Sequence, residues 1–71
     1  MEEAIGVGRF HRYVIEPQPE GVYLFIFEKA GSSFPEKDFL EDSKEVVKEI
    51  CKEDYGVSIE SWGPYHGDSL R

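Results

Sequence analysis

Val22-Tyr23-Leu24-Phe25-Ile26-Phe27 is the stretch that decides the fold of this 71-residue chain. It is rich in β-branched and aromatic side chains, which predicts a strand, and it is too short for a membrane span, which needs about 20 apolar residues. Because a strand points alternate side chains to opposite faces, both faces of this strand are apolar. A single helix covers only one face of a small sheet, so something else must cover the second.

A preceding strand is predicted over residues 10–15, which are β-prone. The loop over residues 17–21 contains two prolines and Gly21. Proline cannot donate to a strand ladder and glycine accepts positive φ, so this loop closes a hairpin with residues 22–28.

One amphipathic helix is predicted over about residues 39–55, because its apolar side chains fall in a single sector at about 100° per residue. Asp38 or, earlier, Ser33 would cap its start. Ser43 lies in the apolar sector as a small residue that permits close approach to the sheet. Asp54 also projects into that sector.

The helix is expected to end at Gly56, which suits the left-handed position, with Val57 folding back onto the last turn. Residues 57–62 then alternate in hydropathy and predict a third strand, in which Ile59 shares the helix-side face with Leu24 and Ile26.

The predicted fold class is therefore α+β, with the order β-β-α-β and a three-stranded sheet that carries the helix on one face. A right-handed crossover would run the third strand parallel to strand 22–28, which we place in the centre. A central strand 10–15 is the alternative. We expect one domain over residues 1–71, with residues 1–8 and 63–71 flexible or loosely attached.

The net charge of −7 excludes the basic surplus that nucleic-acid binding through the overall field requires, and it would repel anionic membranes. The same charge would attract a basic partner. Cys51 is the single cysteine, so no disulfide scaffold is expected. We therefore expect a cytoplasmic location.

The residues that could carry catalysis or bind metal have ordinary structural interpretations. Cys51 near the helix end is expected in the core, and His11 is expected to be solvated or paired across strands. His66 and Asp68 would supply two metal ligands, whereas a structural zinc site needs four. We expect no enzyme activity, no cofactor and no metal. A small hydrolase or metal enzyme would need the fold to bring these four residues together.

The second sheet face is the candidate interaction surface. With Leu24 and Ile26 against the helix, Tyr23, Phe25, Phe27 and Trp62 point away from it, and Tyr13 is the fifth candidate for this surface. The register of the hairpin decides whether Tyr13 and Ile15, or Phe10 and Val14, join this set. Such a patch usually marks a partner site. The alternative is that the chain's own ends cover this face, through five apolar residues: Ala4, Ile5, Val7, Tyr65 and Leu70.

The expected function is protein–protein interaction through the aromatic face, including a homodimer. One alternative is single-stranded nucleic-acid binding by base stacking on these aromatics. Another is an acidic inhibitor of a basic protein. The element order also occurs in small acidic antitoxins and immunity proteins, but no motif accompanies it, so no family is assigned.

Overall fold

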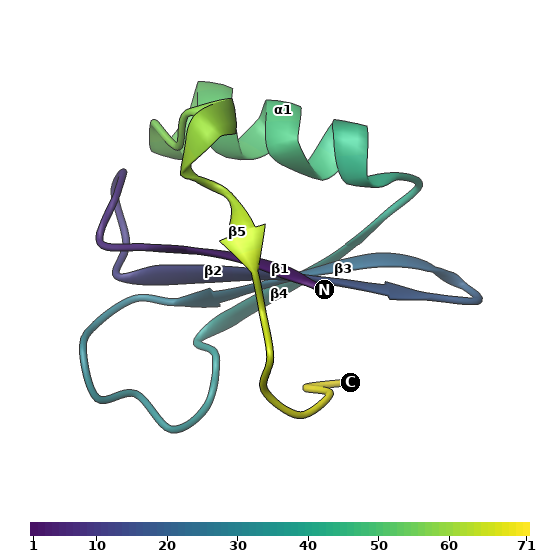
Figure 1. Ribbon diagram of the computed structural model, residues 1–71, viewed down its shortest axis with the longest axis horizontal. Coiled ribbons are helices and arrows are strands. Elements are labelled where there is room, and N and C mark those ends of the chain that lie inside the picture. The colour runs from purple at the N-terminus through teal and green to yellow at the C-terminus, as the bar shows by residue number, and fades with distance from the viewer.

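The computed structural model describes residues 1–71 as an α+β fold with one helix packed on a five-stranded antiparallel sheet (Figure 1). The coarse class is therefore as predicted, but the three-stranded sheet is wrong. The strand order is β4-β3-β2-β1-β5. The elements, in chain order, are β1 Glu2–Ile5, β2 Arg12–Gln18, β3 Gly21–Phe27, β4 Lys37–Glu41, helix α1 Lys44–Tyr55, the 3-10 helix η1 Ile59–Ser61 and β5 Gly63–Pro64.

The predicted hairpin is present as β2 and β3, which pair with Ile15 opposite Leu24. The predicted loop over residues 17–21 is too long, because Pro17 and Gln18 belong to β2 and pair with Val22 and Gly21. Both strands are interior, but β2, which has two strands on each side, is the central one. The alternative with the first hairpin strand in the centre is thus the observed arrangement.

Residues 37–41 form the edge strand β4 rather than the start of the helix, which corrects the predicted helix over 39–55. Phe39 pairs with Leu24 of the neighbouring strand β3. This pairing holds residues 37–41 as a strand, so they do not form the first turn of the helix. The helix begins at Lys44, and Ser43 is its N-cap, whose hydroxyl accepts a hydrogen bond from the Val46 N–H at 3.2 Å. Ser43 therefore caps the helix, and the predicted caps at Asp38 and Ser33 are wrong.

The end of the helix is as predicted. Gly56 has φ 74° in the left-handed region. Val57 folds back, is fully buried and donates its N–H to the Cys51 carbonyl at 3.0 Å. This contact satisfies one of the carbonyls that a helix end leaves open.

The predicted parallel third strand over residues 57–62 is wrong. Residues Ile59–Ser61 form η1, and Ile59 is 46% exposed rather than in the core. The chain then crosses the sheet edge, where Gly63–Pro64 pair antiparallel with β1. The place beside β2 is taken by β1, whose four residues show no periodic pattern in the sequence.

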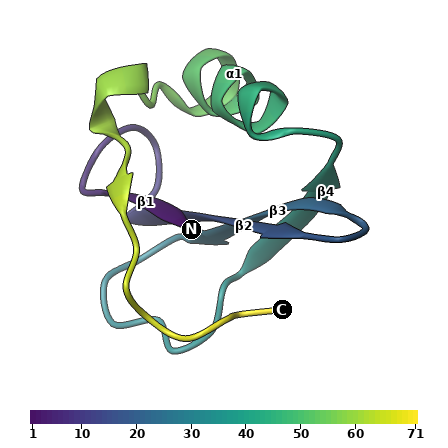
Figure 2. The ribbon, with the colours of Figure 1, turned by 45° about the vertical axis from the view of Figure 1, so that its right-hand side comes forward.

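Two apolar cores lie on opposite faces of the sheet. The larger core holds Tyr13, Ile15, Leu24 and Ile26 under the helix residues Val47 and Cys51. The smaller core holds Val14, Phe25 and Phe27. Figures 1 and 2 show the helix on one side of the sheet, and the C-terminal segment and the loop between β3 and β4 on the other. The helix is neither long nor apolar enough to cross a membrane.

Candidate functional site

The structure divides the five predicted surface aromatics between the two faces of the sheet. Tyr13 belongs to the core under the helix, and Trp62 packs against that core with its ring 6.4 Å from Tyr13. Tyr23, Phe25 and Phe27 lie on the opposite face. The hairpin register places Val14, not Tyr13, beside Phe25. The five side chains therefore do not form one surface.

The aromatic face that remains is covered by the chain's own C-terminal segment. Phe25 and Phe27 are only 4% and 2% exposed, and Tyr65 and Leu70 pack against their cluster. Arg71 places its guanidinium 5.1 Å from the Tyr23 ring centre. Of the terminal residues expected to cover this face, Tyr65 and Leu70 do so.

The other terminal residues lie elsewhere. Ala4 and Val7 contribute to the core under the helix, and Ile5 is exposed. Arg12 also contacts the aromatic face, where its guanidinium lies 4.0 Å from the centre of the Phe27 ring. Cation–π contacts of this kind stabilise by about 0.5–1 kcal/mol at exposed sites.

Glu16 anchors the C-terminal segment. Its side chain, 1% exposed, accepts a hydrogen bond from the Leu70 N–H at 2.7 Å, one from the Ser69 hydroxyl, and one from the Gln18 amide. Burial acts to raise the pKa of Glu16, but the hydrogen bonds from Ser69, Leu70 and Gln18 outweigh it and hold the pKa below its ordinary value. The carboxylate is therefore a structural acceptor.

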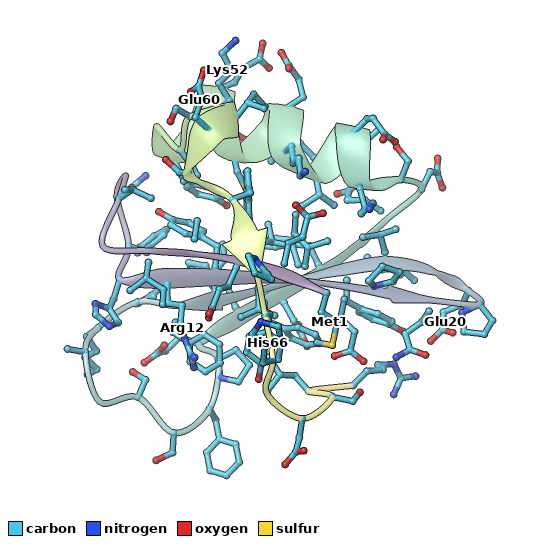
Figure 3. The ribbon with its side chains drawn as sticks, viewed as in Figure 1. Met1, Arg12, Glu20, Lys52, Glu60 and His66 are labelled. Carbon is cyan, nitrogen blue, oxygen red and sulfur yellow. The ribbon has the colours of Figure 1, made fainter.

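The candidate catalytic and metal-binding residues are not brought together. Cys51 lies in the core under the helix, where burial raises its pKa to about 12, so the thiolate needed for nucleophilic attack is disfavoured. His66 lies beyond the opposite face of the sheet (Figure 3). No group of three His, Cys, Asp or Glu side chains is placed to hold a metal ion.

One groove, which we call the β4–α1 groove, opens between the edge strand and the helix. Its volume is about 220 Å³, and it is lined by Leu24, Phe39, Glu41, Ile50, Asp54 and Tyr55. Four of these six residues are apolar. Phe39 is 42% exposed, and Leu40, its neighbour on β4, is exposed on the other face of the strand. The groove thus offers apolar surface to the solvent at the edge of the sheet.

The charge around this groove is negative. Glu41 and Asp54 line it, and neither takes part in any of the chain's ion pairs. At about 100° per residue, Glu53 follows Ile50 on the same flank of the helix.

Three lysines of β4 and α1 pair with acids outside the groove. Lys44 and Lys48 reach Glu2 on β1, at 3.5 and 2.8 Å. Lys37, on β4 itself, pairs with Glu28 at 3.2 Å. None of these three lysines therefore forms an ion pair with a carboxylate of the groove.

Sequence patterns alone identify part of this groove. Asp54 stands out as an acid in the apolar sector of the helix. The sequence does not predict the groove, because the predicted helix over residues 39–55 contains both Phe39 and Ile50. The groove requires these two side chains to lie on two facing elements. The pairing of Phe39 with Leu24 creates the second wall.

Comparison of the chain with protein-family models, with curated proteins and with solved structures finds no match in any of the three.

Proposed function

We propose that this protein is a protein-binding module whose β4–α1 groove takes a basic segment of another protein. The observation that carries the proposal is that the exposed Phe39 and the partly buried Ile50 share one groove with the carboxylates of Glu41 and Asp54, which take part in no ion pair. An apolar centre with a polar, charged rim is the usual anatomy of a protein interface.

The apolar part of the groove supplies affinity. Burying apolar surface stabilises a complex by about 25 cal/mol per Å² before the entropic costs of association are subtracted. Phe39 is large, partly exposed and held by the sheet, which suits it to act as an anchor.

The acidic rim supplies selectivity. The carboxylates at the groove, together with the net charge of −7, attract Lys and Arg side chains and repel acidic ones. A homodimer through this groove has less support, because a second copy would bring the same carboxylates into contact with one another.

The aromatic sheet face gives less support to an interaction, because Phe25 and Phe27 are covered by the C-terminal segment. Base stacking of single-stranded nucleic acid on these rings has less support for the same reason. The acidic surface also lacks the positive groove that accompanies such stacking.

Titration with a short synthetic peptide tests the proposal. The peptide has a centre of Ile and Val residues flanked by lysines, and two comparison peptides replace either the lysines by glutamates or the centre by serines. We expect amide chemical shifts of groove residues to respond to the first peptide, and at least tenfold weaker binding of the other two. Equal binding of the glutamate peptide would contradict the proposal.

A double variant, Glu41→Gln with Asp54→Asn, is expected to weaken the lysine peptide about tenfold, since each rim charge contributes about 0.5–1 kcal/mol. The matched control is Glu60→Gln with Asp68→Asn. Both control residues are exposed acids that do not line the groove, and Figure 3 shows Glu60 beside Lys52 near the C-terminal end of the helix. An equal loss of binding in both double variants would show that only net charge matters.

A further inference from the structure

We infer that the basic segment binds as an additional strand paired with the free edge of β4, with its side chains entering the β4–α1 groove. This inference rests on the proposed function, and it specifies the conformation of the partner. Strand addition to an exposed sheet edge is a recurring mode of peptide recognition, in which the backbone supplies affinity and alternate side chains supply specificity.

The first observation is that the backbone of β4 is paired on one side only. Lys37–Glu41 pair with β3, and β4 is the last strand of the sheet. None of the eight backbone hydrogen bonds outside the regular elements involves these five residues. No side chain bonds to their backbone either. Figure 2 shows no segment of the chain lying beyond β4 in the sheet.

The opposite edge of the sheet differs. There β1 is covered by β5, whose Pro64 has no N–H to offer to a further strand. The Tyr65 N–H continues the contact by bonding to the Met1 carbonyl at 3.1 Å. The chain itself therefore covers one edge of the sheet, whereas the backbone groups of β4 that point away from β3 remain open along this five-residue strand.

The second observation is the alternation of side chains along β4. Phe39 and Glu41 pair with Leu24 and Val22 and share their helix-side face, so they border the groove. Asp38 and Leu40 face the other way. An added strand would thus place an apolar residue beside Phe39 and basic residues beside Glu41 on one face and Asp38 on the other.

The charge of this edge favours a basic strand over a second copy of the chain. Three of the six residues from Lys37 to Asp42 are acids, and Lys37 is already paired with Glu28. Antiparallel pairing of β4 with another β4 would also bring two helix flanks that carry Glu53 and Asp54 toward each other. Like charges across a strand pair are destabilising.

Backbone N-methylation of the lysine-flanked peptide tests this inference. Successive N–H groups of a strand point to opposite edges, so an added strand uses one alternate set to pair with β4. Two peptides are methylated on either the odd or the even central nitrogens. We expect one to bind within about twofold of the parent and the other to lose at least tenfold. We also expect slower hydrogen exchange of β4 amides in the complex.

The outcomes separate this inference from the proposed function. If both methylated peptides bind like the parent, the groove is filled by side chains alone, and strand addition is overturned while the proposed function stands. Loss of binding with both sets would also overturn strand addition. No binding of the parent peptide would overturn both proposals. Light scattering that shows a dimer dissociated by the peptide would assign the edge to a second copy.

Discussion

At the scale of single residues, Gly8 positions the loop between β1 and β2 against the end of the helix. Its φ is +68°, and a Cβ at this position would lie 2.9 Å from the Val57 side chain and closer still to the Tyr55 carbonyl. The next residue, Arg9, donates its N–H to that carbonyl at 2.8 Å. The loop therefore caps the last turn of the helix, and a side chain at Gly8 would push it away.

We predict that Gly8→Ala lowers the free energy of unfolding by about 3 kcal/mol, from positive-φ strain plus overpacking. Gly6→Ala is the control, because Gly6 has φ +70° and nothing lies within 4 Å of the added Cβ. Its loss of about 1 kcal/mol measures the backbone strain without overpacking. Urea unfolding followed by Trp62 fluorescence measures both. Equal losses would show that the loop does not pack as described.

Glu16 links stability to pH. Its pKa is lowered in the folded state, so its contribution is fully present above the unfolded pKa of about 4.3 and is lost as pH falls through the folded pKa. We predict that Glu16→Gln costs about 1–3 kcal/mol near neutral pH, because an NH2 donor replaces one of the two buried carboxylate oxygens that accept hydrogen bonds.

The same variant should be less sensitive to acid than the parent protein. Urea unfolding near pH 6 and near pH 3 should show the two free energies converging at the lower pH. The other carboxylates are common to both proteins and cancel in the comparison. Parallel pH dependences would contradict the assigned role of Glu16.

At the scale of elements, the N-terminal turn of the helix depends on Ser43. Its hydroxyl accepts from the Val46 N–H and satisfies one of the four N–H groups that a helix start leaves open. We predict that Ser43→Ala lowers the free energy of unfolding by about 1 kcal/mol and that Ser43→Asp restores most of it. Loss in Ser43→Asp with no loss in Ser43→Ala would instead mean that the position requires a small side chain and not a cap.

The C-terminal segment is the element that covers the aromatic face. We predict that deletion of residues 69–71 lowers the free energy of unfolding by about 2 kcal/mol, through lost contacts of Leu70 and lost hydrogen bonds to Glu16. It should also increase binding of a hydrophobic dye, as Phe25 and Phe27 become exposed. His66→Ala, an exposed change in the same segment, should leave both readouts unchanged.

At the scale of the whole molecule, the acidic balance governs association. The carboxylates of the β4–α1 groove act together with the net charge of −7. We predict that raising the salt concentration from about 50 to about 500 mM weakens binding of the lysine peptide by about tenfold, mainly through a slower association rate. Stopped-flow kinetics measures this change. The double variant at Glu41 and Asp54 should show a shallower dependence on salt.

Local patterns predicted the parts of the fold that depend on neighbours in the sequence. The hairpin turn at Gly21, the helix end at Gly56 and the burial of Cys51 are in this group. Phe39 and Trp62 were misplaced, because each fits a local pattern equally well in two elements. The pairing of β4 with β3 places Phe39 in a strand, and the 3-10 helix η1 places Trp62 directly after its last residue.

The double-sided hydrophobicity of Val22–Phe27 is a property of the sequence alone, because alternation along a strand is set by backbone geometry. It determined that both sheet faces would be covered and that the helix would cover one of them. Only the tertiary structure decided that the C-terminal segment covers the other face and that β4 remains at the free edge. Those choices depend on contacts between residues distant in the chain, such as Leu70 with Glu16, whose free energies no local pattern encodes.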